Sequence, residues 1–183
     1  MIDQIISIDP SLKSTGIYIK SGNASFSMAI KGNKHKRDSV LNIRTWIRKY
    51  INDFPITTAI VEDYAYAIQN SRSITTLAEV KGVILSELYA RNINIIIMPI
   101  QTWKTVMGVP SMKKNADYVK YFKKIYALND KYFKTADEID AYLMYLCTIK
   151  LEKWAVTETQ IKIQEKIKKA LIDKKENDAY GKN

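Results

Sequence analysis

Short runs of β-branched apolar residues recur along the first hundred residues of this chain. Each run is too short for most helices and is bounded by turn-forming residues, a pattern typical of buried strands. The predicted strands cover residues 4–9, 16–20, 24–30, 58–61 and 93–98. The first three follow one another through short turns, so we expect them to form an antiparallel meander.

Apolar residues elsewhere recur three or four positions apart, which indicates amphipathic helices. The predicted helices cover residues 38–53, 73–91, 112–128 and 136–149. Thr135 and Glu138 have the spacing of a capping box at the start of the last of these. Gly82 lies inside the second, where it costs about 1 kcal/mol relative to Ala. Close packing of Gly82 against a strand or a second subunit would offset that cost.

The order of these elements predicts an α/β fold. A mixed five-stranded sheet would carry an antiparallel hairpin on one side and be flanked by helices. One core accounts for residues 1–150, and residues 151–183 form a charged, helix-prone extension. Ile163, Ile167 and Leu171 fall on one stripe of that extension, and the composition of the last ten or so residues predicts disorder.

A carboxylate ends each of two predicted buried strands. Asp9 is the last residue of the first strand, and Glu62 comes directly after the strand at 58–61. A carboxylate in such a position needs a compensating metal ion, lysine or set of hydrogen-bond donors. Asp63 comes next, but successive side chains of a strand point to opposite faces. We therefore expect Glu62, rather than Asp63, to face Asp9.

Two further carboxylates, Asp137 and Asp140, lie three positions apart near the start of a predicted helix and share one face. If they converge with Asp9 and Glu62, the site contains oxygen ligands only. Such a ligand set suits Mg²⁺ or Mn²⁺ rather than zinc. Oxygen-only sites that hold two ions about 3.5–4 Å apart serve phosphodiester hydrolysis.

The charge of the chain favours a polyanionic partner. The 183 residues carry a formal net charge of +10, with a pI near 9.5, which is most simply explained by nucleic-acid binding. The alternative is a lysine-rich proteome encoded by AT-rich genes. No apolar run is long enough for a membrane span. The single cysteine, Cys147, excludes an intrachain disulfide and fits an intracellular, cytoplasmic setting.

Four segments in order resemble the RuvC Holliday-junction resolvases of the RNase H-like superfamily. Residues 9–16 (DPSLKSTG) are similar to the first family motif, and Glu62 after its strand resembles the second. Residues 101–114 resemble the segment that holds the functional lysines, and residues 136–141 (ADEIDA) resemble the closing acidic motif. The resemblance extends from residue 4 to about 150.

This resemblance implies a metal-dependent, homodimeric endonuclease that cuts four-way DNA junctions. The implied catalytic and metal-binding tetrad is Asp9, Glu62, Asp137 and Asp140, with two Mg²⁺ ions, or Mn²⁺ in their place, in each site. Lys104 corresponds to one functional lysine, and Lys114 or Lys113 to the other. The predicted helix 73–91 corresponds to the subunit interface.

The resemblance also implies DNA contacts. Tyr64 or Tyr66 corresponds to an aromatic ring that stacks near the junction centre, and Lys120 lies on a basic helix face that would add DNA affinity.

Trp103 is expected to belong to the core. Ser11 stands where the family usually has glycine, which predicts a different loop conformation after Asp9.

The sequence therefore predicts a structure-selective DNA endonuclease that acts on Holliday junctions and other branched DNA. One alternative is a non-catalytic junction or nucleic-acid-binding protein with the same fold. Another is an RNase H-like nuclease that acts on RNA or flaps. The small size and AT-biased composition favour a phage or viral member, acting in the host cytoplasm. The extension is expected to add a helix that packs on the core or contacts DNA.

Overall fold

The computed structural model describes residues 4–63, 71–129, 132–153 and 158–180. In that part of the chain, one mixed sheet has the strand order β3-β2-β1-β4-β5. Its strands are β1 (Gln4–Asp9), β2 (Ser14–Ser21), β3 (Ala24–Lys31), β4 (Thr58–Glu62) and β5 (Asn94–Met98). The first three pair antiparallel, whereas β4 pairs parallel with both β1 and β5. The predicted mixed five-stranded sheet is confirmed.

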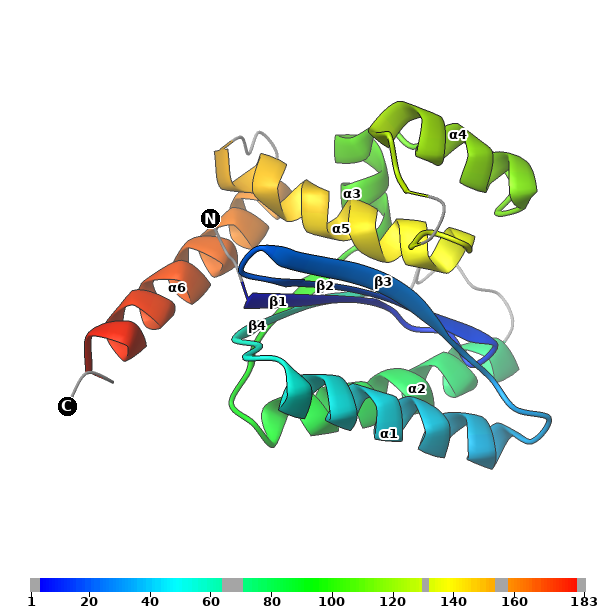
Figure 1. Ribbon diagram of the computed structural model, residues 1–183, viewed down its shortest axis with the longest axis horizontal. Helices are drawn as coiled ribbons and strands as arrows, with labels where there is room; N and C mark the ends of the chain where they lie inside the picture. Colours follow the sequence, from blue (N-terminus) through cyan, green and yellow to red (C-terminus); the bar gives the residue numbers. More distant parts are fainter. Residues whose placement is uncertain (1–3, 64–70, 130–131, 154–157, 181–183) are drawn as a thin grey trace.

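Helices cover both faces of the sheet, and each face has its own apolar core (Figure 1). The helices α1 (Lys36–Asp53) and α2 (Ser71–Tyr89) cover one face. On the other face lie α3 (Ile100–Met107), α4 (Ala116–Tyr126) and α5 (Ala136–Lys153), and α6 (Glu158–Tyr180) packs on α5 and β5. Among the described helices, none is both long and apolar enough to cross a membrane.

The strand register brings the first two predicted carboxylates together at the carboxyl ends of two neighbouring strands. Ile8 of β1 is paired with Val61 of β4, and the two strands run parallel. Asp9 and Glu62 each follow by one residue, so both lie at the carboxyl ends of adjacent strands. The carboxyl ends of the parallel strands are where α/β sheets commonly bind ligands.

A glycine allows the start of α5 to lie close to the carboxyl end of β1. Gly16 of β2 is paired with Asp9, and a Cβ atom built on Gly16 would lie 2.0 Å from the carbonyl oxygen of Asp137. No side chain fits in that space. The start of α5 can therefore lie directly over the end of β1 only because residue 16 has no side chain.

The segment between β5 and α5 differs from the prediction. Residues 100–107 form α3, which was not predicted, and the helix expected from residue 112 begins only at Ala116. Asn115 explains the later start, because its side chain accepts hydrogen bonds from the backbone N–H groups of Asp117 and Tyr118. As a result, Lys113 and Lys114 lie in a connecting segment instead of on a helix.

The C-terminal extension forms a helix that packs on the core, as expected. Ile163 and Ile167 of α6 are 4% and 0% exposed. The helix continues to Tyr180, into the segment whose composition predicted disorder, and residues 181–183 lie outside the described part. At Gly82, no atom of another described element lies within 4 Å of the position that a Cβ would occupy, so Gly82 does not pack closely against a strand of the sheet.

Candidate active site

Four carboxylates converge at the carboxyl ends of β1 and β4. Asp9 is 4% exposed, and burial together with the neighbouring charge of Asp9 holds the pKa of the Glu62 carboxyl well above its usual value. A hydrogen bond between the two carboxyls contributes in the same direction. Such a shift indicates that two carboxyl groups are so close together here that both are not readily ionised at once.

The other two carboxylates come from the first two turns of α5. The capping box fixes where this helix begins: Thr135 Oγ1 accepts from the Glu138 N–H at 3.3 Å, and Glu138 Oε2 accepts from the Thr135 N–H at 2.6 Å. Asp137 remains partly exposed, whereas Asp140 is fully buried. A buried carboxylate at that depth requires positive charge or hydrogen-bond donors.

Lys114 supplies positive charge among these carboxylates. Its Nζ atom lies 2.5 Å from Asp140 Oδ2, 3.1 Å from Asp9 Oδ2 and 3.9 Å from Asp137 Oδ1. Burial alone would lower the pKa of Lys114, but the charges of Asp9 and Asp140 outweigh it and raise that pKa. The ammonium is therefore charged, and one cation faces four carboxylates.

Two aromatic residues that the sequence did not single out for this site complete it. Trp103 Nε1 donates a hydrogen bond to Glu62 Oε1 at 2.8 Å, and the hydroxyl of Tyr118 donates to Asp140 Oδ1. Both rings are buried, so the expectation that Trp103 belongs to the core is confirmed. Neither role has a sequence signal, because an apolar helix position looks the same with or without a polar partner.

Asp140 is subject to opposing electrostatic effects. The net result raises its pKa to about 6: burial is the largest cause, and the charge of Asp9 acts in the same direction, whereas Lys114 and the hydrogen bond from Tyr118 oppose the rise. Its Oδ2 atom is buried, and within the described part of the chain its polar contact is the Lys114 ammonium, 2.5 Å away. The site thus has more negative charge than Lys114 can compensate.

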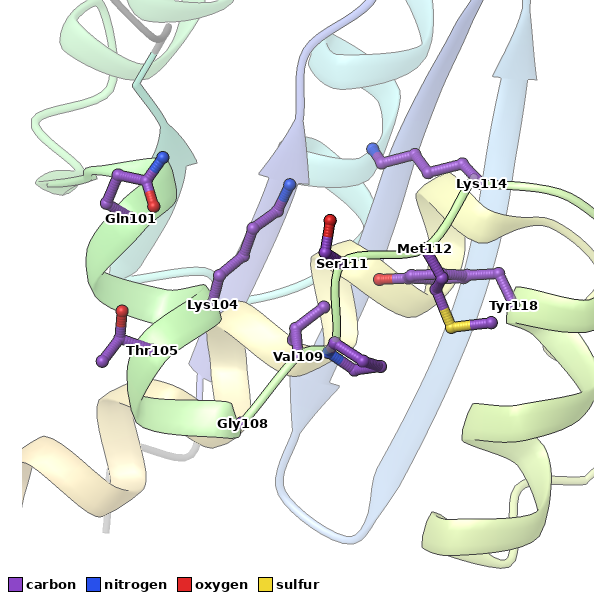
Figure 2. A pocket seen from close by; sticks show the side chains of 10 residues that line it. Gln101, Lys104, Thr105, Gly108, Val109, Ser111, Met112, Lys114 and Tyr118 are labelled. Carbon is purple, nitrogen blue, oxygen red and sulfur yellow. The ribbon is translucent and has the colours of Figure 1, made fainter.

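A cleft of about 420 Å³ adjoins Lys114 and Tyr118, which contact the acidic cluster. Figure 2 shows the side chains that line this cleft. The cleft is lined by α3, the connecting segment and the start of α4, and it reaches the cluster at Lys114 and Tyr118. Lys104 lines the same cleft, with its Nζ atom 5.5 Å from the centre of the Trp103 ring. In Figure 2 the side chains of Lys104 and Lys114 extend toward the same side of the segment that carries Ser111.

Comparison with known families agrees with this arrangement. The profile of the family described as crossover junction endodeoxyribonuclease RuvC matches residues 5–148. This chain belongs to the RuvC family. The protein is accordingly an endodeoxyribonuclease, and the family assignment made from the four motifs is confirmed. No curated protein sequence matches the chain.

Solved structures support the RuvC fold at low sequence identity. Thermus thermophilus RuvC in complex with a Holliday junction substrate has a TM-score of 0.62 and 12% identity, with 79% of this chain and 91% of that one covered. A second Thermus thermophilus RuvC structure has a TM-score of 0.59, 14% identity and coverages of 79% and 92%. The yeast mitochondrial Holliday junction resolvase Ydc2 has a TM-score of 0.52, 11% identity and coverages of 91% and 82%.

The remaining candidate residues of this RuvC-family protein lie in several places. Asp63 points away from the cluster and forms a 2.5 Å ion pair with Lys81, as expected if Glu62 faces Asp9. Lys113 and Lys120 are exposed, on the connecting segment and on α4. Tyr64 and Tyr66 lie outside the described residues.

Ser11 replaces the usual glycine of the first RuvC motif without an unusual backbone conformation. Its φ angle is not positive, and Thr15 closes the turn. Thr15 Oγ1 donates to the Ser11 carbonyl at 2.6 Å and accepts from the Ser11 N–H at 3.2 Å. A side chain is therefore tolerated at position 11.

The acidic cluster is chemically suited to a divalent cation. Its donors are carboxylate oxygens, the type that Mg²⁺ and Mn²⁺ prefer. The buried Asp140 Oδ2 has the Lys114 ammonium as its one polar neighbour in the part of the chain that the structure describes, and the closeness of Asp9 to Glu62 disfavours the charged form of Glu62. Among the described residues, no group of three acidic, His or Cys side chains lies close enough together to hold a metal ion as the side chains stand. Lys114 provides the positive charge between Asp9 and Asp140.

Proposed function

We propose that this protein is a metal-dependent, structure-selective endonuclease that cleaves four-way DNA junctions by two-metal phosphodiester hydrolysis. The observation that carries the proposal is the convergence of four carboxylates at the carboxyl ends of two neighbouring strands, beside a cleft lined by two lysines. Membership of the RuvC family supports a crossover junction as the substrate. The Thermus thermophilus RuvC of similar fold is in complex with a Holliday junction substrate, which supports the same substrate class.

Asp9, Glu62, Asp137 and Asp140 are the residues that would hold two Mg²⁺ ions, with Mn²⁺ as a substitute. When bound, such ions activate the attacking water and stabilise the leaving oxygen. The protein's own contribution is to keep four carboxyl groups together in a largely buried site, where their charged forms are costly unless positive charge is close by. Lys114 offsets part of that cost in the metal-free protein.

Lys104 and Lys114 would bind the phosphates on either side of the scissile bond. Both line the cleft that adjoins the carboxylates, and a lysine neutralises phosphate charge wherever the backbone passes. Lys113 and Lys120 lie further out and would add affinity for the DNA arms, in keeping with the net charge of +10. Tyr64 or Tyr66 would stack near the junction centre.

The functional unit would be a homodimer, because a four-way junction presents two equivalent strands for cleavage. We propose α2 as the subunit interface, as the family resemblance implies. The exposed face of this helix carries small residues at Ala78, Gly82 and Ser86. Small residues on an exposed helix face allow two helices to approach closely.

Replacing single carboxylates tests the mechanism. In Asp9→Asn and Asp140→Asn, junction cleavage in Mg²⁺ should fall at least about 10³-fold, equivalent to about 4 kcal/mol of transition-state stabilisation. Junction binding should persist because the lysines remain. Asp117→Asn, an exposed carboxylate on α4, is the matched control and should cleave normally. Wild-type cleavage rates in the first two variants would refute the two-metal mechanism.

A substrate panel tests the specificity. Four-way junctions, flaps, nicked and linear duplexes and RNA–DNA hybrids should be incubated with the wild-type protein, with and without Mg²⁺. Selective, Mg²⁺-dependent nicking of the four-way junction supports the proposal. Binding without nicking of any substrate would favour a non-catalytic junction-binding protein, and faster cleavage of flaps or RNA would favour a related RNase H-like nuclease.

A further inference from the structure

Two buried aromatic side chains each direct their single polar hydrogen at one carboxylate of the acidic cluster. The indole N–H of Trp103 donates to Glu62 Oε1 at 2.8 Å, and the hydroxyl of Tyr118 donates to Asp140 Oδ1. Trp103 is 0% exposed and Tyr118 is 2% exposed, so both hydrogen bonds lie in largely buried surroundings. Each ring therefore fixes the orientation of the carboxylate it contacts.

In both pairs only one carboxylate oxygen is occupied by the aromatic donor. The other oxygen of Asp140, Oδ2, receives nothing from the aromatic donor and lies 2.5 Å from the Lys114 ammonium. Glu62 in turn adjoins the carboxyl of Asp9, whose Oδ2 contacts the same ammonium at 3.1 Å. The Asp140 oxygen that the aromatic donor leaves unoccupied therefore faces the position where a positive charge already lies.

We propose that Trp103 and Tyr118 are positioning residues for divalent-cation binding, an inference that rests on the proposed cation site. Each would hold one oxygen of a ligand carboxylate and leave the other oxygen free for the cation. Hydrogen bonds to the ligands of a metal ion orient those ligands, and their loss lowers metal affinity. Neither residue is catalytic in the strict sense, because each acts through Glu62 or Asp140.

The position of these residues in the chain gives the two hydrogen bonds a second consequence. Trp103 lies on α3 and Tyr118 on α4, the helices on either side of the segment that carries Lys114. Because these hydrogen bonds anchor both helices to the carboxylates, they hold the walls of the adjoining cleft at a fixed position relative to the acidic cluster. Trp103 also lies beneath Lys104, which lines that cleft.

Direct cation binding tests the proposal. Trp103→Phe and Tyr118→Phe remove the N–H or O–H and keep an aromatic ring. Trp46→Phe and Tyr50→Phe are the matched controls, because both lie on α1 on the opposite face of the sheet. Mn²⁺ binding should be measured by calorimetric titration of the full-length protein, together with the melting temperature without metal and cleavage across a range of Mg²⁺ concentrations.

We expect the two site variants to bind Mn²⁺ about 10- to 100-fold more weakly than the controls. Their metal-free melting temperatures should change no more than those of the controls, and raised Mg²⁺ should restore cleavage. Unchanged Mn²⁺ affinity in folded variants would overturn the proposal. If Trp103→Phe does not fold, benzothienylalanine at position 103, which has the ring shape without the N–H, makes the same test.

Failure of the proposed function gives a different result. Wild-type protein that binds Mn²⁺ but cuts no junction refutes the function, while the affinities of the variants still decide the positioning role. Wild-type protein that cuts junctions, with variants that bind Mn²⁺ like the controls, refutes the positioning role alone. Wild-type protein that binds no divalent cation refutes both.

Discussion

The absence of a side chain at position 16 determines how closely the four carboxylates approach one another. Gly16 is the antiparallel partner of Asp9 on β2, and the backbone of Asp137 lies against it. Any side chain here would push the start of α5 away from the sheet. Asp137 and Asp140 would move with it, whereas Asp9 is held by its strand.

We therefore predict that Gly16→Ala destabilises the protein by about 1–3 kcal/mol, the usual cost of overpacking, and also removes cleavage. Gly22→Ala is the matched control. Gly22 has a φ of 56° and no neighbour within 4 Å of a Cβ position. The alanine there should cost about 1–2 kcal/mol through backbone strain alone and leave cleavage intact. Urea denaturation measures the stability of the two variants, and a junction-cleavage assay measures their activity. Normal cleavage by Gly16→Ala would contradict the role of Gly16 in bringing the carboxylates together.

Individual residues also mark the limit of what the sequence could predict. Asp9 and Glu62 were predictable because a carboxylate that ends an apolar run is conspicuous. Gly16 and Trp103 fall within the matched motifs, but their roles and that of Tyr118 were not predictable, because those roles depend on distances between elements that are remote in sequence. Local pattern carries no information about such distances.

At the scale of elements, one buried carboxylate ties α1 to α2. Glu87 of α2 has a side chain that is 4% exposed, and it accepts hydrogen bonds from Arg44 at 2.7 Å, from Arg48 at 2.8 and 3.0 Å and from Arg91 at 3.1 Å. The hydrogen bond from Arg48 is the main cause that lowers the pKa of Glu87 to about 2; burial opposes it, and Arg44 and Arg91 add to it.

Because the folded-state pKa of Glu87 lies below its ordinary value of 4.5, the charged form stabilises the fold above about pH 4.5. That contribution is lost as the pH falls from 4.5 toward 2. Glu87→Gln should cost about 2 kcal/mol at pH 7, since its arginine partners are partly exposed. The difference from wild type should shrink over that pH interval. Urea denaturation at stepped pH measures it.

Glu79→Gln is the control for that experiment. Glu79 pairs with Lys36 on the same two helices, but both side chains are nearly half exposed. Its loss should cost less than about 1 kcal/mol at any pH. A cost of Glu87→Gln that stays constant from pH 7 to pH 2 would show that the carboxylate charge does not stabilise the α1–α2 contact.

The elements themselves were largely predictable, and the exceptions have local causes. Periodicity indicates the strands and the amphipathic helices, and the capping box at Thr135 marks the start of α5. The helix α3 has no comparable signal because it spans only eight residues, Ile100–Met107, directly after a strand and a proline. The predicted start of α4 is too early because periodicity alone does not take account of the cap at Asn115.

At the scale of the whole molecule, the face of α2 that points away from the sheet is suited to contact with another subunit. Val80, Ile84 and Leu88 are fully buried against the sheet, while Gly82 is exposed and Tyr89 is 64% exposed. A glycine in the middle of an exposed helix face costs helix stability within a single chain. Approach of a second copy's helix would offset that cost, which agrees with the proposed homodimer.

Gly82→Glu tests this arrangement. Nothing lies within 4 Å of a Cβ at position 82, and Glu is the better helix former by about 0.5–1 kcal/mol, so the protomer should be no less stable. Two glutamates facing each other in a close helix pair would, however, separate the subunits. Sedimentation velocity should show dimers for wild type and monomers for the variant. Leu41→Glu, at an exposed apolar position on α1, should remain dimeric. A dimeric Gly82→Glu protein would place the interface elsewhere, because neither the bulk nor the charge of glutamate fits between two closely packed α2 helices.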